Sequence, residues 1–220
     1  MWSTPIDLYC ERLGPSFWAE PFNAASNFAF IVAAAAAFNR WRQEGSRDPA
    51  VLALIAAAFV VGLGSFAFHT LATRGAMLLD VIPIGIFIYA YFLFALCRML
   101  VLSWPVSLTA LGGFAALSTG IASFVPRAVL NGSTGYFPAL AALLVLGTML
   151  RKKSCGRVML AAAAVFIASI TLRIIDLDIC PAFPTGTHFL WHILYAIVLY
   201  LLLRAALAVQ GPRAFAKVVR

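Results

Sequence analysis

Charged residues are scarce in this chain: Asp, Glu, Lys and Arg make up 11% of its 220 residues, whereas hydrophobic residues make up 63%. A soluble domain is about half apolar and about a quarter charged. The chain therefore lacks the polar side chains that would cover a water-facing surface, and its hydrophobicity also excludes intrinsic disorder. A polytopic helical membrane protein remains, because apolar stretches of roughly 20 residues span a bilayer.

Acidic residues are the scarcer charge, with 8 Asp and Glu against 16 Lys and Arg and a net charge of +8. The basic residues form no stripe with interleaved aromatic residues, so we exclude nucleic acid as a partner. They fall in short loops between apolar runs, where such residues set membrane topology. The first 20 residues contain no basic n-region followed by an apolar h-region, so we expect no cleavable signal peptide.

Seven apolar stretches are long enough to cross a bilayer as helices. They cover residues 21–41, 50–71, 76–99, 106–124, 135–150, 157–175 and 187–209. Charged residues, Pro and Gly fill the breaks between them, as in short loops. The expected fold class is an all-α membrane protein of seven transmembrane helices, forming a single membrane domain over residues 1–220. Residues 1–20 would form an extramembrane N-terminal segment, and residues 210–220 a cytoplasmic tail.

Seven spans put the two ends of the chain on opposite sides of the membrane. Only four of the 16 basic residues fall on the N-terminal side: Arg12, Arg74, Arg127 and Arg173. Six of the 8 acidic residues fall on that same side. Because basic residues accumulate in cytoplasmic loops, we expect the N-terminus outside and the C-terminus in the cytoplasm.

The chain has only three histidines, and they are not scattered. His69 falls near the outer end of the second span, and His188 and His192 occupy the first two turns of the seventh. Asp80 lies about one turn below the outer start of the third span. All four groups thus share one depth near the outer face. Ionisable groups inside membrane spans are costly and usually functional, so this placement indicates a site.

The spacing of these residues indicates a metal. His188 and His192 are four residues apart, which puts both imidazoles on one helix face, and His69 can add a third nitrogen from another helix. Three protein ligands with a fourth position open are typical of a catalytic zinc. Asp80 could orient a histidine or handle a proton from metal-bound water. Ser65, four residues before His69, lies on the same helix face.

Other interpretations stay open at this point. Histidines near helix ends can reach the membrane interface without binding a metal, and a serine in a membrane helix often bonds its own backbone. A lipid receptor or transporter-like protein with a structural zinc would need a closed, four-ligand site, and the spans offer no fourth His and no nearby Cys. A rhodopsin-type pump needs a Schiff-base Lys in its last span, which this chain lacks.

Taken together, these residues resemble the alkaline ceramidase family, part of a superfamily of seven-span membrane metal hydrolases that includes the adiponectin receptors. The resemblance covers nearly the whole chain. It is carried by YCER and FWAEPFNAASN (within 9–27), GSFAFHT (64–70), LLDVIPI (78–84) and THFLWHILYA (187–196). It implies that His69, His188 and His192 bind zinc and that Ser65 and Asp80 are catalytic. It also implies hydrolysis of the amide bond of ceramide to sphingosine and a fatty acid, a step of sphingolipid metabolism.

The resemblance implies a calcium site on the N-terminal segment as well. The matching acids are Asp7, Glu11 and Glu20, although Asp7 is one residue out of register. Calcium needs six or more oxygen ligands. The alternative is that these acids are solvated on an outer loop, with Glu20 as an early carboxylate at the start of the first helix. Asn23 and Asn27 share one face of that helix, where packing hydrogen bonds are their expected role.

The working hypothesis is a zinc-dependent membrane amidase that acts on ceramide or a related N-acyl lipid within the bilayer. The short loops and Ala-rich spans look bacterial, and many bacteria lack sphingolipids, so hydrolysis of a non-sphingoid lipid is the alternative on the same scaffold. The expected location is a bacterial inner membrane, with the metal site near the periplasmic face. Oligomeric state and acyl-chain preference stay open.

The four cysteines form two groups under this topology. Cys10 and Cys180 lie outside, whereas Cys97 and Cys155 lie towards the cytoplasm, where thiols stay reduced. We predict a Cys10–Cys180 disulfide and two free inner thiols. The resemblance supports the bridge, because the family also links its N-terminal segment to the loop before the last span.

Overall fold

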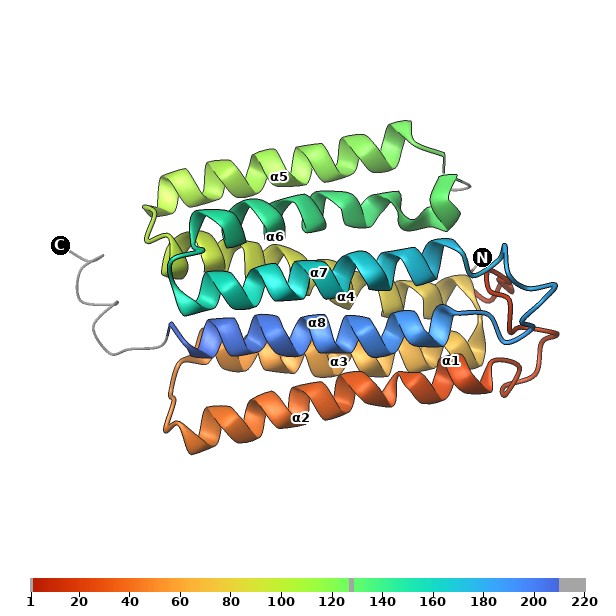
Figure 1. The fold of residues 1–220 in the computed structure, drawn as a ribbon. Coiled ribbons are helices and arrows are strands. Elements are labelled where there is room, and N and C mark those ends of the chain that lie inside the picture. The colour runs from red at the N-terminus through yellow and green to blue at the C-terminus, as the bar shows by residue number, and fades with distance from the viewer. Residues whose placement is uncertain (1, 127–128, 210–220) are drawn as a thin grey trace.

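The protein is a bundle of long helices, as a computed structural model that describes residues 2–126 and 129–209 shows (Figure 1). The predicted tail at 210–220 lies outside the described residues. The first half of the chain forms α1 (Pro21–Ser26), α2 (Phe28–Gln43), α3 (Pro49–Leu71), α4 (Arg74–Phe94) and the π-helix η1 (Ala95–Met99). The second half forms α5 (Trp104–Phe124), the 3-10 segment η2 (Val129–Tyr136), α6 (Phe137–Met149), α7 (Ser154–Ile174) and α8 (His188–Leu207).

Seven helical units in the described part of the chain are long and apolar enough to cross a membrane. This confirms the predicted all-α, seven-span fold and a multi-pass membrane protein. Short elements complete three of the spans: α1 with α2, α4 with η1, and η2 with α6. The fifth span differs most from its predicted bounds. It begins at Val129 instead of residue 135, because η2 extends it at its N-terminal end. The direction of the bundle across the membrane stays a prediction.

Local chemistry explains where several helices begin. Proline occupies the first turn of α1, α3, α5 and α6, where its missing N–H leaves no helical hydrogen bond unmade. Asp48 caps α3 by accepting from the Ala50 N–H at 2.9 Å, and Thr73 caps α4 by accepting from the Ala76 N–H at 3.2 Å. These residues fix the helix ends between which the chain reverses.

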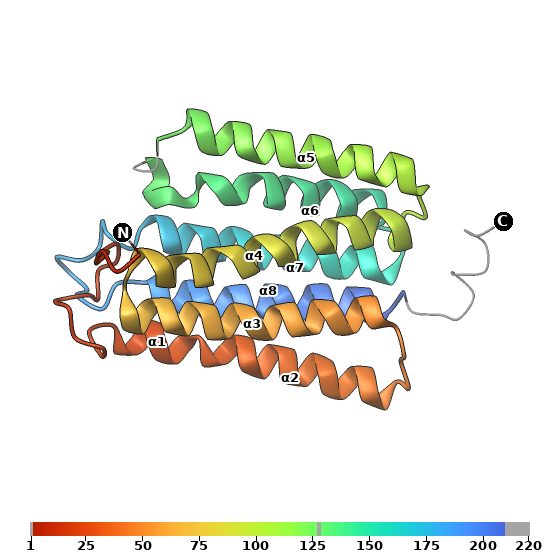
Figure 2. The same cartoon turned by 180° about the vertical axis from the view of Figure 1, so that it is seen from behind.

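Helix α8 lies at the centre of the bundle. It packs against α2, α3 and α7, and it is the most buried of the seven spans. Helix α5 lies at one edge, beyond α6, and is the least buried (Figures 1 and 2). Small residues let helices pack closely, and several are buried here: Ala33, Ala34 and Ala37 of α2 and Ala162 and Ala163 of α7.

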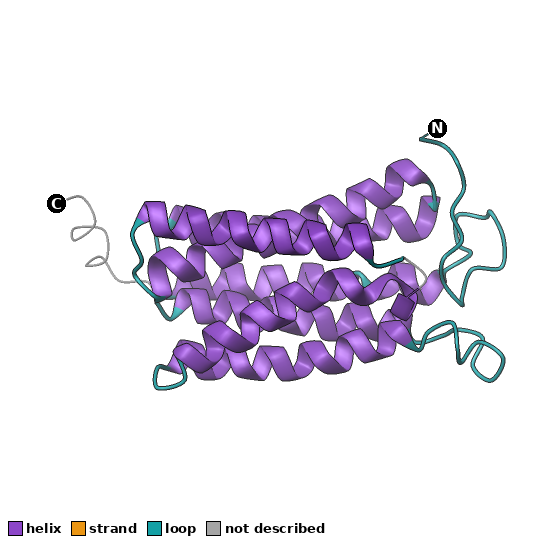
Figure 3. Cartoon of the chain, turned by 90° about the horizontal axis from the view of Figure 1, so that it is seen from above, coloured by secondary structure: helices purple, strands orange, loops and turns teal. Residues whose placement is uncertain are grey.

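The longer connections gather at the end of the bundle that carries the N-terminus (Figure 3). The N-terminal segment pairs with the α3–α4 turn: the Ile6 N–H donates to the Ala72 carbonyl at 2.7 Å, and Pro5 forms an isolated bridge with Thr73. Tyr9 packs on Phe68. The segment before α1 therefore covers the last turn of α3, which carries His69.

Candidate metal centre

Three histidines meet at the covered end of the bundle. His69 lies near the end of α3, and His188 and His192 occupy the first two turns of α8. Each is at most 2% exposed. One nitrogen from each ring can be chosen so that all three lie within 4.8 Å of one another. The structure thus brings together the three residues that the sequence predicted to share a site.

Outer contacts orient two of these rings. The Glu20 carboxylate lies 2.6 Å from His69 Nδ1, and the Ser26 hydroxyl lies 2.7 Å from His192 Nδ1. Histidines that bind metals are oriented in this way, through the ring nitrogen that does not face the metal. The opposite nitrogen of His69, Nε2, is buried and has no hydrogen-bond partner among the described residues, and neither has His188 Nδ1. Buried polar atoms seldom go without a partner, so these imidazoles fit a metal ion.

Ser65 and Asp80 line a cavity of about 80 Å³ together with His188 and His192. Ser65 is buried, and Asp80 Oδ1 is buried without a hydrogen-bond partner in the part of the chain that the structure describes. The two come together because α3 and α4 touch at Gly64. A Cβ atom there would lie 1.9 Å from the Leu79 carbonyl oxygen, so only glycine permits this approach. The residues after Gly64 and Leu79 are Ser65 and Asp80 themselves.

A comparison with protein families matches residues 9–212 to the Ceramidase family. The chain belongs to the Ceramidase family. No individual curated protein matches it. Membership supports a membrane role in the hydrolysis of ceramide and implies a hydrolase that acts on amide bonds. Three buried histidines that could hold a metal ion agree with such an activity.

The cavity of this ceramidase-family chain also holds an arginine that sequence reasoning used only as a topology marker. Arg173, in the last turn of α7, lines the cavity with Asp80. Its Nη1 donates to the Asn131 carbonyl and, at 3.1 Å, to the Ser133 hydroxyl, both in η2. Its guanidinium lies 5.6 Å from the Tyr136 ring centre. Its position inside a span, at the depth of the histidines, was the signal that could have identified it.

Tyr9 was missed for a different reason, because it lies in the loop-like segment before α1. Its ring stacks on His188 with 3.7 Å between ring centroids, and it lines the same cavity. Burial raises the pKa of the Tyr9 hydroxyl above its ordinary value, so the phenol stays protonated. No periodic pattern marks such a residue, and only the folded chain places it over the histidines.

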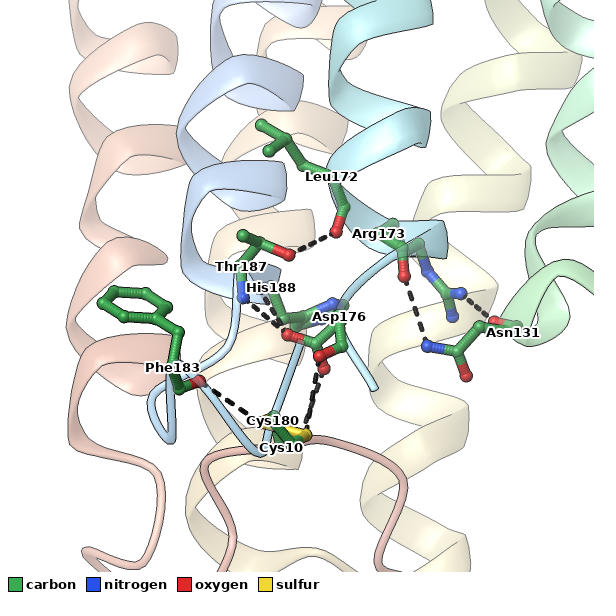
Figure 4. The surroundings of a disulfide bond; sticks show 9 residues. All are labelled: Cys10, Asn131, Leu172, Arg173, Asp176, Cys180, Phe183, Thr187 and His188. Carbon is green, nitrogen blue, oxygen red and sulfur yellow. Dashed lines mark hydrogen bonds between the residues drawn. A yellow bond between two sulfur atoms is a disulfide. The ribbon is translucent and has the colours of Figure 1, made fainter. Parts of the chain in front are cut away.

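Asp176 organises the loop that precedes α8 (Figure 4). Its Oδ1 accepts from the backbone N–H groups of Thr187 and His188 at 2.7 and 2.9 Å, and its Oδ2 accepts from the Cys10 N–H at 3.2 Å. The carboxylate thus satisfies free N–H groups at the start of α8. Gly186 adopts a φ of +62°, and a Cβ there would lie 2.2 Å from Asp176 Oδ1. Glycine is therefore needed where the chain enters the helix.

The predicted disulfide between Cys10 and Cys180 is confirmed, with their Cα atoms 5.5 Å apart (Figure 4). It ties the N-terminal segment to the α7–α8 loop, eight residues before His188. Cys97 and Cys155 are free, as predicted. The bridge and Asp176 together hold Tyr9 in place, since Cys10 takes part in both contacts.

The three acids expected from the family resemblance to bind calcium do not gather. Asp7 is exposed. The two oxygens of Glu11 accept from the backbone N–H groups of Phe22 and Asn23, at 2.6 and 2.8 Å. Within the described residues, the histidine triad is the one cluster of three or more His, Cys, Asp or Glu side chains spaced to hold a metal. With Asp7 exposed and the oxygens of Glu11 and Glu20 bonded to N–H groups, the arrangement seen here does not fit a calcium ion, which needs six or more oxygens.

Glu20 has partners on both oxygens: Arg12 contacts Oε1, while Asn23 Nδ2 and His69 contact Oε2. Burial raises the pKa of Glu20, but its contacts with His69, Asn23 and Arg12 outweigh burial and hold that pKa below its usual value. Burial raises the pKa of Glu11, in spite of the N–H groups of Phe22 and Asn23. Asn27 Nδ2 donates to the Asn23 backbone carbonyl at 2.8 Å, a local bond, and packing hydrogen bonds between helices stay a prediction for this pair.

Proposed function

We propose that the protein is a zinc-dependent membrane amidase that hydrolyses ceramide, or a related N-acyl lipid, to a fatty acid and an amine. One observation carries this proposal: three buried histidines lie together, two of them with a ring nitrogen that has no partner among the described residues, beside a cavity lined by His188, His192, Asp80 and Ser65. Family membership supports the choice of an amide bond in ceramide.

Zinc suits this donor set, because three imidazoles with a position left open are typical of a catalytic zinc site. The cluster contains His69, His188 and His192 and no fourth His, Cys, Asp or Glu among the described residues. A bound zinc ion would supply a Lewis acid that polarises the scissile carbonyl and makes water nucleophilic near neutral pH. Glu20 and Ser26 would keep two of the rings in the orientation that binding requires.

Asp80 is proposed as the general base and acid. Asp80 lines the cavity, and its Oδ1 has no hydrogen-bond partner within residues 2–126 and 129–209. It can therefore accept a proton from the attacking water and later deliver one to the leaving amine. The Ser65 hydroxyl would donate a hydrogen bond to the developing oxyanion. Removal of a general acid–base group costs about 10²- to 10⁴-fold in rate, which sets the loss we expect for Asp80→Asn.

An apolar cavity of about 50 Å³ lies deeper in the bundle, lined by side chains from α4 to α8. It shares Tyr195 with the polar cavity beside the histidines. This order, from polar to apolar, suits an N-acyl lipid whose amide lies at the histidines and whose acyl chain points into the bundle. The polar head of the lipid would then remain at the end covered by the N-terminal segment. With the predicted topology, that end faces the periplasm of a bacterial inner membrane.

The deciding experiment measures zinc content and the release of fatty acid from labelled ceramide by the purified protein. His192→Ala should abolish both, whereas Ile193→Ala, a partly lipid-facing neighbour in α8, should keep both. Ser65→Ala should retain zinc and lose about 10²- to 10³-fold in rate. Its matched control is Ser118→Ala, whose hydroxyl bonds only the carbonyl of Phe114 in its own helix. Full activity in a metal-free variant would refute the proposal.

The same assay separates the alternatives. A receptor or transporter-like protein with a structural zinc would bind the metal through the three histidines and release no fatty acid from any lipid. A hydrolase of a non-sphingoid lipid would leave ceramide intact and cleave another member of a panel that contains N-acyl amino-acid lipids and lysolipids.

A further inference from the structure

Arg12 is a buried cation, 7% exposed, that no step of the proposed hydrolysis uses. Its guanidinium meets oxygens from three separate parts of the chain. Nε pairs with the Glu20 carboxylate, Nη1 donates to the Gly14 carbonyl at 2.9 Å, and Nη2 donates to the His69 carbonyl at 2.9 Å. The side chain therefore binds both the backbone of one histidine of the triad and the carboxylate that orients its ring.

These contacts form a closed ring around His69. Arg12 binds Glu20, Glu20 Oε2 lies 2.6 Å from His69 Nδ1, and the His69 carbonyl accepts from Arg12. Glu20 is only 2% exposed, and a buried carboxylate without a positive partner is strongly unfavourable. Without the guanidinium, the buried Glu20 carboxylate would lose its positively charged partner.

The oxygens around this guanidinium are of the kind that hard cations bind. One carboxylate and two backbone carbonyls are typical ligands of Ca²⁺, and here all three are hydrogen-bonded to Arg12. Both oxygens of Glu11 accept hydrogen bonds from the backbone N–H groups of Phe22 and Asn23. The guanidinium thus supplies the positive charge among oxygens that would otherwise suit a metal ion.

We propose that Arg12 is a positioning residue of the metal centre: its guanidinium is a built-in cation that holds Glu20 and His69 in place, so that the centre forms without calcium. The inference rests on the proposed function only in that the three histidines bind zinc. An Arg side chain suits this task better than Lys, because its planar fork can meet several oxygens at once.

The first experiment uses the unaltered protein, loaded with zinc and freed of calcium. Equilibrium dialysis with radioactive Ca²⁺ should show no saturable binding up to about 1 mM, the weak end of protein calcium sites. Zinc affinity, measured by competition with a metal indicator, should be the same with and without calcium. Saturable calcium binding, or a zinc affinity that rises with calcium, would overturn the proposal even if no variant could be purified.

The second experiment uses Arg12→Ala. Loss of an outer contact to a metal ligand lowers metal affinity by roughly 10- to 100-fold, and we expect a loss of that size in zinc affinity. Guanidinium chloride at low millimolar concentration should restore most of it, because the free ion can occupy the space that the side chain leaves. A purely structural arginine would show no such rescue. Unchanged zinc affinity in the variant, or a loss that guanidinium does not restore, would overturn the proposal.

The matched control is Arg74→Ala at the same end of the bundle. Arg74 is exposed and belongs neither to the cavity nor to the contacts of Arg12. The zinc affinity of the Arg74→Ala variant should therefore equal that of the unaltered protein and should not respond to guanidinium. If the unaltered protein bound no zinc, or if His192→Ala bound zinc equally well, the proposed function would fail. Calcium binding by the unaltered protein would count against this inference alone.

Discussion

The contact between α3 and α4 at Gly64 provides a sharp test of how the site is assembled. A Cβ atom at this position would lie 1.9 Å from the Leu79 carbonyl oxygen and 2.7 Å from the carbonyl carbon. Real Cβ contacts are essentially never shorter than 3.0 Å, so the two helices must separate by about 1 Å. Both atoms belong to a helix backbone, and no side-chain rotation can relieve the clash.

In Gly64→Ala, this separation should move Ser65 away from Asp80. Forced overpacking of this kind costs about 1–3 kcal/mol in stability, and a displacement of 1 Å at a reacting centre can cost about 10²-fold in rate. We therefore expect a lower midpoint of thermal unfolding in detergent and a drop of that order in kcat/KM. Zinc should remain bound, because α4 carries none of the three histidines: His69 lies on α3, and His188 and His192 lie on α8.

The control is Gly85→Ala in α4, where an added Cβ meets nothing within 4 Å. Alanine is a better helix former than glycine by about 1 kcal/mol, so this variant should be as stable as the unaltered protein or slightly more stable, with full activity. If Gly64→Ala matched Gly85→Ala in both unfolding midpoint and kcat/KM, the reasoning about this helix contact would be refuted.

Four further outcomes are expected. Replacing Cys10 and Cys180 with Ser should lower activity with little effect on global folding, since both ends of the bridged loop are anchored in the membrane; full activity in the double variant would contradict this. Arg173→Lys should resemble Arg173→Ala, with kcat/KM reduced in both, because an ammonium does not reproduce the planar guanidinium that lies near the Tyr136 and Trp191 rings. Gly186→Ala should weaken zinc binding through displacement of Asp176, measured by indicator competition, and an unchanged affinity would rule this out. A reporter fused after the last residue should be active only in the cytoplasm, and periplasmic activity would reverse the predicted orientation.

Much of the site could be predicted from the sequence because membrane spans impose a simple geometry. Helix length fixes depth, so the positions of His69, His188 and Asp80 along their spans placed them at one level. The four-residue spacing of the pair in α8 put two imidazoles on one face. The separation of the cysteines by membrane side likewise led to the Cys10–Cys180 bridge that the structure contains.

Contacts between segments with no periodic pattern were decided only by the tertiary structure. The positions of Arg12 and Glu20 in the sequence placed both outside the membrane, but they did not show that the Arg12 guanidinium binds the Glu20 carboxylate and the His69 carbonyl. It could not place Tyr9 on His188, since that contact depends on the bridge, Asp176 and the pairing of residues 5–6 with the α3–α4 turn. Helix periodicity and apolar length are encoded locally, whereas the partner of a buried charge depends on which loops the folded bundle brings to the same end.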